Sequence, residues 1–141
     1  MQVATLKEQI CAVSGTAGAF LAHAFGPWDK SLGTLMIFMA VDFVMGIGIA
    51  GILKKSPKTS CGALESKIGW EGLFRKGISL VFVLIGYRLD ILFNSDYIRN
   101  TVIIAFMTNE LISIVENAGI MGVPLPNAVK NAINILTQKK I

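Results

Sequence analysis

Carboxylates stand inside apolar stretches of this 141-residue chain, and they are the residues whose chemistry needs explaining. Asp42 lies near the middle of the run 34–53, Glu110 lies in the middle of another run, and Asp90 lies towards the end of a third. A charge at the centre of a bilayer costs about 3 kcal/mol on insertion scales unless a partner, water or a proton relieves it. These positions therefore indicate either a globular interior or a membrane segment with a polar function.

The other reactive residue types do not form a catalytic or metal-binding pattern. His23 is the single histidine, and Cys11 and Cys61 lack the spacing of a zinc site or a disulfide framework. The sequence also lacks a glycine-rich phosphate loop and a nucleophile elbow. We therefore expect no enzyme, no cofactor and no bound metal.

The composition favours a membrane protein over a soluble domain. Hydrophobic residues make up 53% of the chain and charged residues 16%, whereas soluble domains average about 25% charged residues. A small soluble protein has a large surface to cover with polar groups. We predict an all-α integral membrane protein that forms one domain over residues 1–141, and the alternative is a very apolar soluble helical domain.

Four apolar stretches predict spanning helices, because a helix needs about 20 residues to cross a bilayer. They cover residues 10–26, 32–53, 77–94 and 100–119. The first stretch is short and rich in small residues, so the chain has four spans, or three if this stretch does not cross. A cleaved signal peptide is an alternative for it, because Ala22-His23-Ala24 resembles a cleavage site.

The C-terminal segment 125–138 predicts a short amphipathic helix. Pro124 and Pro126 end the preceding helix, and after them Val129, Ile133 and Leu136 follow a helical apolar spacing. Such a helix lies on the membrane surface or packs beneath the other helices.

The distribution of cations predicts the orientation of the chain. Four spans with both termini in the cytoplasm place ten Lys and Arg residues inside and two outside, as the positive-inside rule requires. The net charge of +4 is therefore a signal of membrane topology and not of nucleic-acid binding. In the central basic loop 54–76, we expect four cations to set orientation and surface attachment: Lys54, Lys55, Arg75 and Lys76.

Polar residues on two of the predicted spans share helix faces. In the fourth span, four of them occupy about a third of the circumference: Asn109, Glu110, Ser113 and Glu116. Because lipid cannot satisfy such a stripe, it must face other helices or water. In the second span, Gly46 and Ala50 follow Asp42 at four-residue intervals, so another helix can approach the carboxylate closely. We expect several copies to pool these faces in a homo-oligomer, and the alternative is polar contact inside a monomeric bundle.

Three features together resemble the phage holins associated with bacterial lysis and with toxin release in clostridia. The first is the Asp42 span followed by a basic loop. The second is "SKIGWEGLFRK", which is similar to the family's Ser, Gly and Arg-Lys pattern and leads into a span that ends in Asp90. The third is "NELISIVENAGIMGVPLPNAVKNAINIL", which is similar to the family's Glu-x-x-Ser-Ile segment and Pro-x-Pro tail. The resemblance extends over residues 35–138.

The resemblance implies a protein of the bacterial host's cytoplasmic membrane that oligomerises and opens a lesion. An endolysin, or in some relatives a toxin, would pass through it. A rival interpretation is a small ion channel or transporter subunit in which Asp42 and Glu110 bind ions or protons. A third is a membrane scaffold that holds a soluble partner through its loop and its C-terminal helix.

Overall fold

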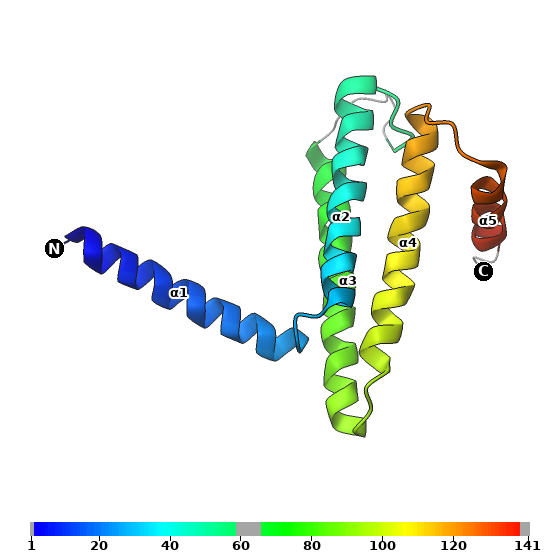
Figure 1. Ribbon diagram of the computed structural model, residues 1–141. Helices are drawn as coiled ribbons and strands as arrows, with labels where there is room; N and C mark the ends of the chain where they lie inside the picture. Colours follow the sequence, from blue (N-terminus) through cyan, green and yellow to red (C-terminus); the bar gives the residue numbers. More distant parts are fainter. Residues whose placement is uncertain (1, 59–65, 139–141) are drawn as a thin grey trace.

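The computed structural model describes residues 2–58 and 66–138, and the regular secondary structure of these residues is helical (Figure 1). The elements in order are α1 (Gln2–Phe25), α2 (Lys30–Gly48), a π-helix η1 (Ile49–Leu53), α3 (Ser66–Phe93), α4 (Ile98–Ile120) and α5 (Asn127–Gln138). Cys61, Lys139 and Lys140 lie outside the described residues. The prediction of an all-helical fold is confirmed.

Two of the helical segments in the described residues are long and apolar enough to cross a membrane, Lys30–Leu53 and Ile98–Ile120. The prediction of four spans is therefore not confirmed. Helix α3 has 28 residues, but six of its side chains are charged. It also begins eleven residues before the predicted span 77–94, because the charged segment before Gly77 continues the helix.

Helices α2, α3 and α4 run alongside one another and form a three-helix bundle (Figure 1). Both α2 and α3 pack mainly on α4 and contact each other much less. We call the end that contains residues 26–31 and 93–98 the turn end, and the opposite end, with residues 49–58 and 66–69, the loop end. Helix α1 leaves the turn end sideways, and α5 stands apart from the bundle beyond α4 (Figure 1).

Ile49 and Ala50 of η1 are buried at the loop end, apart from the main apolar core. This core fills the half of the bundle next to the turn end. Its buried members come from all three helices: Leu32, Leu35, Met39, Val83 and Ile103. In this half, α3 and α4 also approach closely. A Cβ added to Gly86 would lie 3.1 Å from the Cα of Arg99, so any larger residue requires the two backbones to move apart by a few tenths of an ångström.

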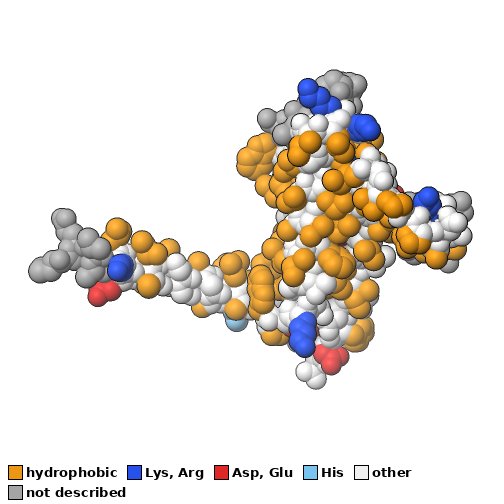
Figure 2. Space-filling view, turned by 45° about the horizontal axis from the view of Figure 1, so that its top comes forward, with side chains coloured by type: hydrophobic (Ala, Val, Ile, Leu, Met, Phe, Trp, Pro, Cys, Tyr) orange, Lys and Arg blue, Asp and Glu red, His pale blue; other side chains and the backbone are white. Residues whose placement is uncertain are grey.

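The outer surface of the bundle is apolar over much of its length. Side chains such as Ile37, Val44 and Leu92 are 62%, 65% and 73% exposed. Figure 2 shows hydrophobic side chains over most of the visible face of the bundle, with charged side chains gathered near its ends. Water does not favour a surface of this kind, whereas hydrocarbon does.

Helix α2 ends at the loop end in the π-helix η1, which terminates at Lys54. This residue has a left-handed backbone conformation, with φ of 50°, and the N–H of Lys55 donates to the Ile49 carbonyl at 3.2 Å. These bonds satisfy carbonyls that the end of the helix would otherwise leave unpaired. Lys54 and Lys55 are both exposed beyond this point, in the loop where the sequence predicts them.

Candidate functional site

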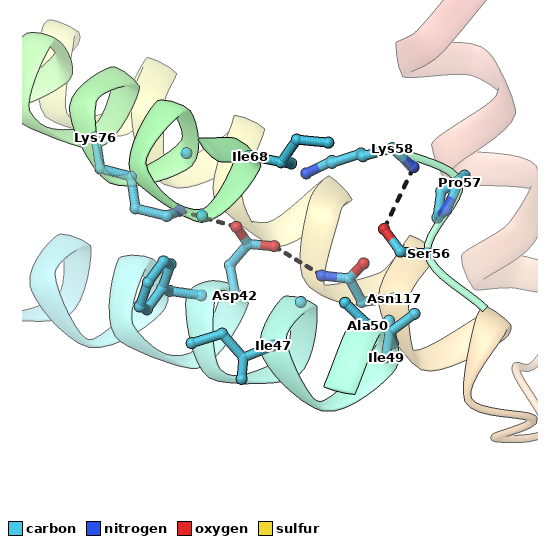
Figure 3. A pocket seen from close by; sticks show the side chains of 14 residues that line it. Asp42, Ile47, Ile49, Ala50, Ser56, Pro57, Lys58, Ile68, Lys76 and Asn117 are labelled. Carbon is cyan, nitrogen blue, oxygen red and sulfur yellow. Dashed lines mark hydrogen bonds and ion pairs between the residues drawn. The ribbon is translucent and has the colours of Figure 1, made fainter. Parts of the chain in front are cut away.

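A charged cluster joins the three helices halfway along the bundle. The ammonium group of Lys76 on α3 lies 2.8 Å from Asp42 Oδ2 on α2 and is also ion-paired with Glu110 Oε2 on α4. The side-chain amide of Asn117 donates to Asp42 Oδ1 at 2.9 Å (Figure 3). The side chains of Lys76, Asp42 and Glu110 are 14%, 12% and 7% exposed. Ions buried this far from water persist only with partners of opposite charge and good geometry.

The cluster lies at the middle of both candidate spans. Asp42 is twelve residues from the start of the segment Lys30–Leu53, and Glu110 is twelve residues from the start of Ile98–Ile120. At 1.5 Å per residue, each carboxylate is about 18 Å along its helix from the turn end. The cluster also carries two carboxylates for one ammonium group.

Two hollows adjoin the cluster on the side of the loop end. The larger, of about 450 Å³, opens between α3 and α4, and we call it the polar groove. Seven polar residues of α3 and α4 line it: Glu71, Arg75, Lys76, Ser79, Asn109, Glu110 and Ser113. The smaller hollow, of about 100 Å³, lies between α2 and the first turns of α3 (Figure 3). The half of the bundle next to the loop end therefore contains two hollows, whereas the other half contains the main apolar core.

The structure corrects the sequence interpretation of the basic loop. Arg75 and Lys76 do not lie in a loop but in the third turn of α3. Lys76 points into the bundle and pairs with two acids, so it is not a cation of the membrane surface. The prediction was wrong here because the partners of Lys76 are each 34 residues away in the sequence, beyond the reach of any local pattern.

The structure brings together some of the other predicted site residues and separates the rest. Asn109 and Ser113 lie on the polar groove beside Glu110, whereas Glu116 is exposed and lines neither hollow. Gly46 and Ala50 line the smaller hollow. In residues 2–58 and 66–138, apart from the adjacent residues and the nearby backbone of its own helix, no atom lies within 4 Å of a Cβ added to Gly46. No other described helix therefore makes the expected close approach at this residue.

Asp90 belongs to a second polar site, at the turn end. It accepts hydrogen bonds from Ser95 Oγ at 2.7 Å and from the N–H groups of Ile98 and Arg99 at 3.0 and 2.9 Å. A carboxylate of α3 thereby caps the first turn of α4, where the helix dipole favours negative charge.

Sequence reasoning missed Arg99, which is the centre of this second site. The guanidinium donates to the carbonyls of Phe25 and Pro27, each at 2.9 Å, and to Asp29 Oδ2 at 2.6 Å. Asp29 in turn accepts from the N–H of Leu32 at 2.9 Å and caps α2. We call this set of residues, with Asp90, the Arg99 clasp. An Asp directly before an apolar helical run was the available signal for Asp29, but no local pattern points to Arg99.

Neighbouring groups change the acidity of Asp29. Its burial raises the pKa, but the hydrogen bonds from Arg99 and from the Leu32 N–H favour the charged form and outweigh the burial. The pKa of Asp29 therefore lies below its ordinary value of 3.8. The clasp thus contains an ionised carboxylate at neutral pH.

The chain is similar to several known proteins. The sequence model of the bacteriophage holin family matches residues 19–138. An uncharacterized 14.9 kDa protein from the nagH 3′ region of Clostridium perfringens is 38% identical over 125 residues, which cover 87% of this chain and 89% of that protein. A protein of Listeria monocytogenes is 33% identical over 123 residues, which cover 86% and 82% of the two chains.

A more distant relative has a functional name. A probable holin of Bacillus phage phi105 is 23% identical over 116 residues, covering 82% of this chain and 79% of the phage protein. No solved structure matches the chain. The holin match includes the charged cluster, the polar groove and the Arg99 clasp, and it extends over most of the sequence. The chain therefore belongs to the bacteriophage holin family, which is not an enzyme family.

Proposed function

We propose that this chain is a holin that oligomerises in the bacterial cytoplasmic membrane and opens a lesion. An endolysin, or a toxin, crosses the membrane through this lesion, and the opening times lysis of the cell. Membership of the holin family supports the proposal, and so does the presence of two membrane-capable helices.

The observation that carries the proposal is the polar groove within an apolar exterior. Lipid satisfies the exposed apolar side chains of the bundle but not the charged walls of the groove. A single bundle leaves this groove open. Assembly of several copies turns the grooves towards one another or towards water, and a lesion needs a water-compatible wall of this kind.

The proposed topology places the loop end in the cytoplasm and the turn end outside. Helices α2, α3 and α4 cross the membrane, α1 provides a fourth crossing, and both termini are cytoplasmic. The distribution of cations supports this orientation. The loop end has the exposed Lys54, Lys55 and Lys58, whereas the turn end has the exposed Lys30 and the buried Arg99, and Arg99 is neutralised by Asp29.

Controlled expression in a bacterium tests the lytic function. The chain is induced together with a cytoplasmic endolysin, and membrane potential, culture density and extracellular endolysin activity are followed in time. We expect growth to continue, followed by abrupt loss of potential and release of the enzyme. Cells that produce only the endolysin, or only the chain, are the controls. Selective ion flux without release of the enzyme would favour the channel or transporter interpretation instead.

Labelling of single cysteines in whole cells tests the topology. In a background with Cys11 and Cys61 replaced by serine, we expect Asp96→Cys at the turn end to react with an impermeant maleimide. We expect Lys55→Cys at the loop end to react only after the cells are permeabilised. The reverse pattern would invert the proposed orientation.

A further inference from the structure

The polar groove contains an imbalance of charge at its floor. Glu110 is 5% exposed, and it shares the single ammonium group of Lys76 with Asp42. One carboxylate of the three-residue set is therefore left without a cation of its own. In a low-dielectric interior, a nearby cation would stabilise this arrangement strongly.

Arg75 supplies an unused cation at the edge of the same groove. Its side chain is exposed and lines the groove, and its guanidinium forms no ion pair with any residue in the described ranges 2–58 and 66–138. Arg75 directly precedes Lys76 in α3, so the two residues differ by about 1.5 Å in height along the helix. Arg75 and Glu110 both line the groove, so a guanidinium at position 75 lies within reach of the depth of the carboxylates.

The depth of the groove in the membrane decides which partner can bind to it. Copies of one chain in a membrane share the same orientation, so only residues at the same depth can come together across an interface between them. Lipid headgroups lie at the two faces of a hydrocarbon layer about 30 Å thick, whereas the cluster lies halfway along the spans. A second copy of the chain, unlike a headgroup, presents a guanidinium at the required depth.

We propose that the polar groove is a self-association surface, on which Arg75 of each copy pairs with the Glu110 carboxylate of the other. A two-fold axis along the membrane normal relates the copies, so one contact occurs twice, as in other isologous interfaces. The imbalance is confined to the floor of the groove. The whole lining has acids at Asp42, Glu71 and Glu110 and cations at Lys58, Arg75 and Lys76, so two facing grooves bring no net charge together. A hollow of about 450 Å³ leaves room for the entering side chain.

This inference specifies the partner in the oligomer of the proposed function, and it rests on that proposal for the membrane setting. It also assigns Arg75 a different role from that of Lys76, although the two cations are adjacent. Lys76 holds the three helices of one copy together, whereas Arg75 joins two copies.

Cross-linking in membranes tests the inference on the full chain. In the background with Cys11 and Cys61 replaced by serine, Ser79→Cys and Ser113→Cys place a thiol on each wall of the groove. A short bis-maleimide is added to cells that express the chain without endolysin. We expect dimers at both positions, and none at Ile37→Cys, which lies on the exposed face of α2. Dimers at position 37 without dimers at 79 and 113 would overturn the proposal.

Substitutions of Arg75 in the same cysteine variants test the ion pair itself. Arg75→Gln removes two pairs for each dimer, and we expect the dimer yield to fall about tenfold, which corresponds to about 1.4 kcal/mol. Arg75→Lys keeps the charge and should retain most of the yield. Arg88→Gln, an exposed cation near the other end of α3, is the matched control and should leave the yield unchanged. Membrane levels of each variant are measured in parallel.

Two results would overturn the inference. One is a dimer yield for Arg75→Gln that equals the yield of the same cysteine variant with Arg75 in place. The other is labelling of the groove cysteines by a small hydrophilic thiol reagent without any cross-linking by the bis-maleimide. This result would mean that water alone fills the groove. The endolysin-release assay is separate, so dimers without release would contradict only the proposed function, and release without these dimers would contradict only the inference.

Discussion

The two halves of the three-helix bundle bury their residues by different means. Between the cluster and the turn end, apolar side chains of all three helices interlock, and the Arg99 clasp closes the end with hydrogen bonds to α1, α2 and α3. Between the cluster and the loop end, two hollows take the place of most of the core, and polar contacts of Lys76 and Asn117 connect the helices. The half next to the turn end is therefore packed within a single chain, whereas the half next to the loop end retains open hollows.

The difference matters because lipid changes what holds helices together. Apolar burial contributes little between helices in a membrane, since lipid tails are as apolar as the side chains they replace. Close packing and polar contacts must therefore decide which helix faces stay together. The half next to the turn end has both, so it is a fixed frame. The half next to the loop end has polar contacts beside open hollows, and in our proposal it is the half that accepts another copy.

The largest test of this comparison is Lys76→Met. The substitution leaves two buried carboxylates without their cation, and breaking a buried ion pair from one side costs about 3–5 kcal/mol. We expect a large loss of helix stability, measured by circular dichroism while SDS is titrated into detergent-solubilised protein. Lys55→Met, at an exposed position beyond η1, is the control and should have little effect.

A triple variant tests whether Lys76→Met destabilises the bundle through the unpaired carboxylates or through a change in packing. Asp42→Asn and Glu110→Gln, combined with Lys76→Met, remove all the charge from the cluster and should recover much of the lost stability. If Lys76→Met alone were as stable as the parent chain, the cluster would not connect the helices and the comparison would fail.

The next test is Arg99→Gln at the turn end. Arg99 is 4% exposed, and its loss leaves the carbonyls of Phe25 and Pro27 and the carboxylate of Asp29 without their donor. Unsatisfied groups of this kind cost about 1–3 kcal/mol. We expect a smaller loss than for Lys76→Met in the same titration, because the apolar core next to the clasp remains. Arg88→Gln is the control, and an equal effect of the two would argue against the clasp.

The sequence predicts the helices better than it predicts their contacts. Apolar runs located α2, α4 and the amphipathic α5 to within a few residues, because hydrophobic periodicity is a local signal. The apolar pattern does not predict the beginning of α3, because the pattern ends at the charged residues before Gly77. The helix continues through them, since charge does not stop a helix whose cations find partners. The ion pairs of Lys76 and Arg99 join residues 34 and 70 positions apart, so no local pattern could reveal them.

A pair of glycine substitutions compares the two halves with one chemical change. Gly86→Ala in the packed half places a Cβ 3.1 Å from the Arg99 backbone and should cost about 1–3 kcal/mol by forcing α3 from α4. Gly46→Ala in the open half meets no atom of the other described helices within 4 Å. It should be neutral or slightly stabilising, since alanine favours helix by about 1 kcal/mol. Both are measured by the SDS titration, and equal effects would show that the halves are packed alike.

The smallest test concerns the pH dependence of the turn end. The pKa of Asp29 is lowered in the folded chain, so the folded state binds a proton less readily than the unfolded state. The carboxylate therefore contributes stability above its unfolded pKa, and this contribution is lost as the pH falls through the lower folded value. Because the side chain is 37% exposed, solvent screening keeps the effect below about 1 kcal/mol.

Comparison of the parent chain with Asp29→Asn isolates this contribution from the other carboxylates. We expect the parent to be more stable at pH 6, and the difference between the two chains to shrink as the pH falls below the ordinary pKa of 3.8. Asp96→Asn removes an exposed acid of the same end that forms no ion pair with any described residue, and it is the matched control for loss of a carboxylate. A stability difference that stayed constant down to strongly acidic pH would mean that the ionised Asp29 does not hold Arg99. The fixed frame would then depend on the two backbone carbonyls and on Asp90 alone.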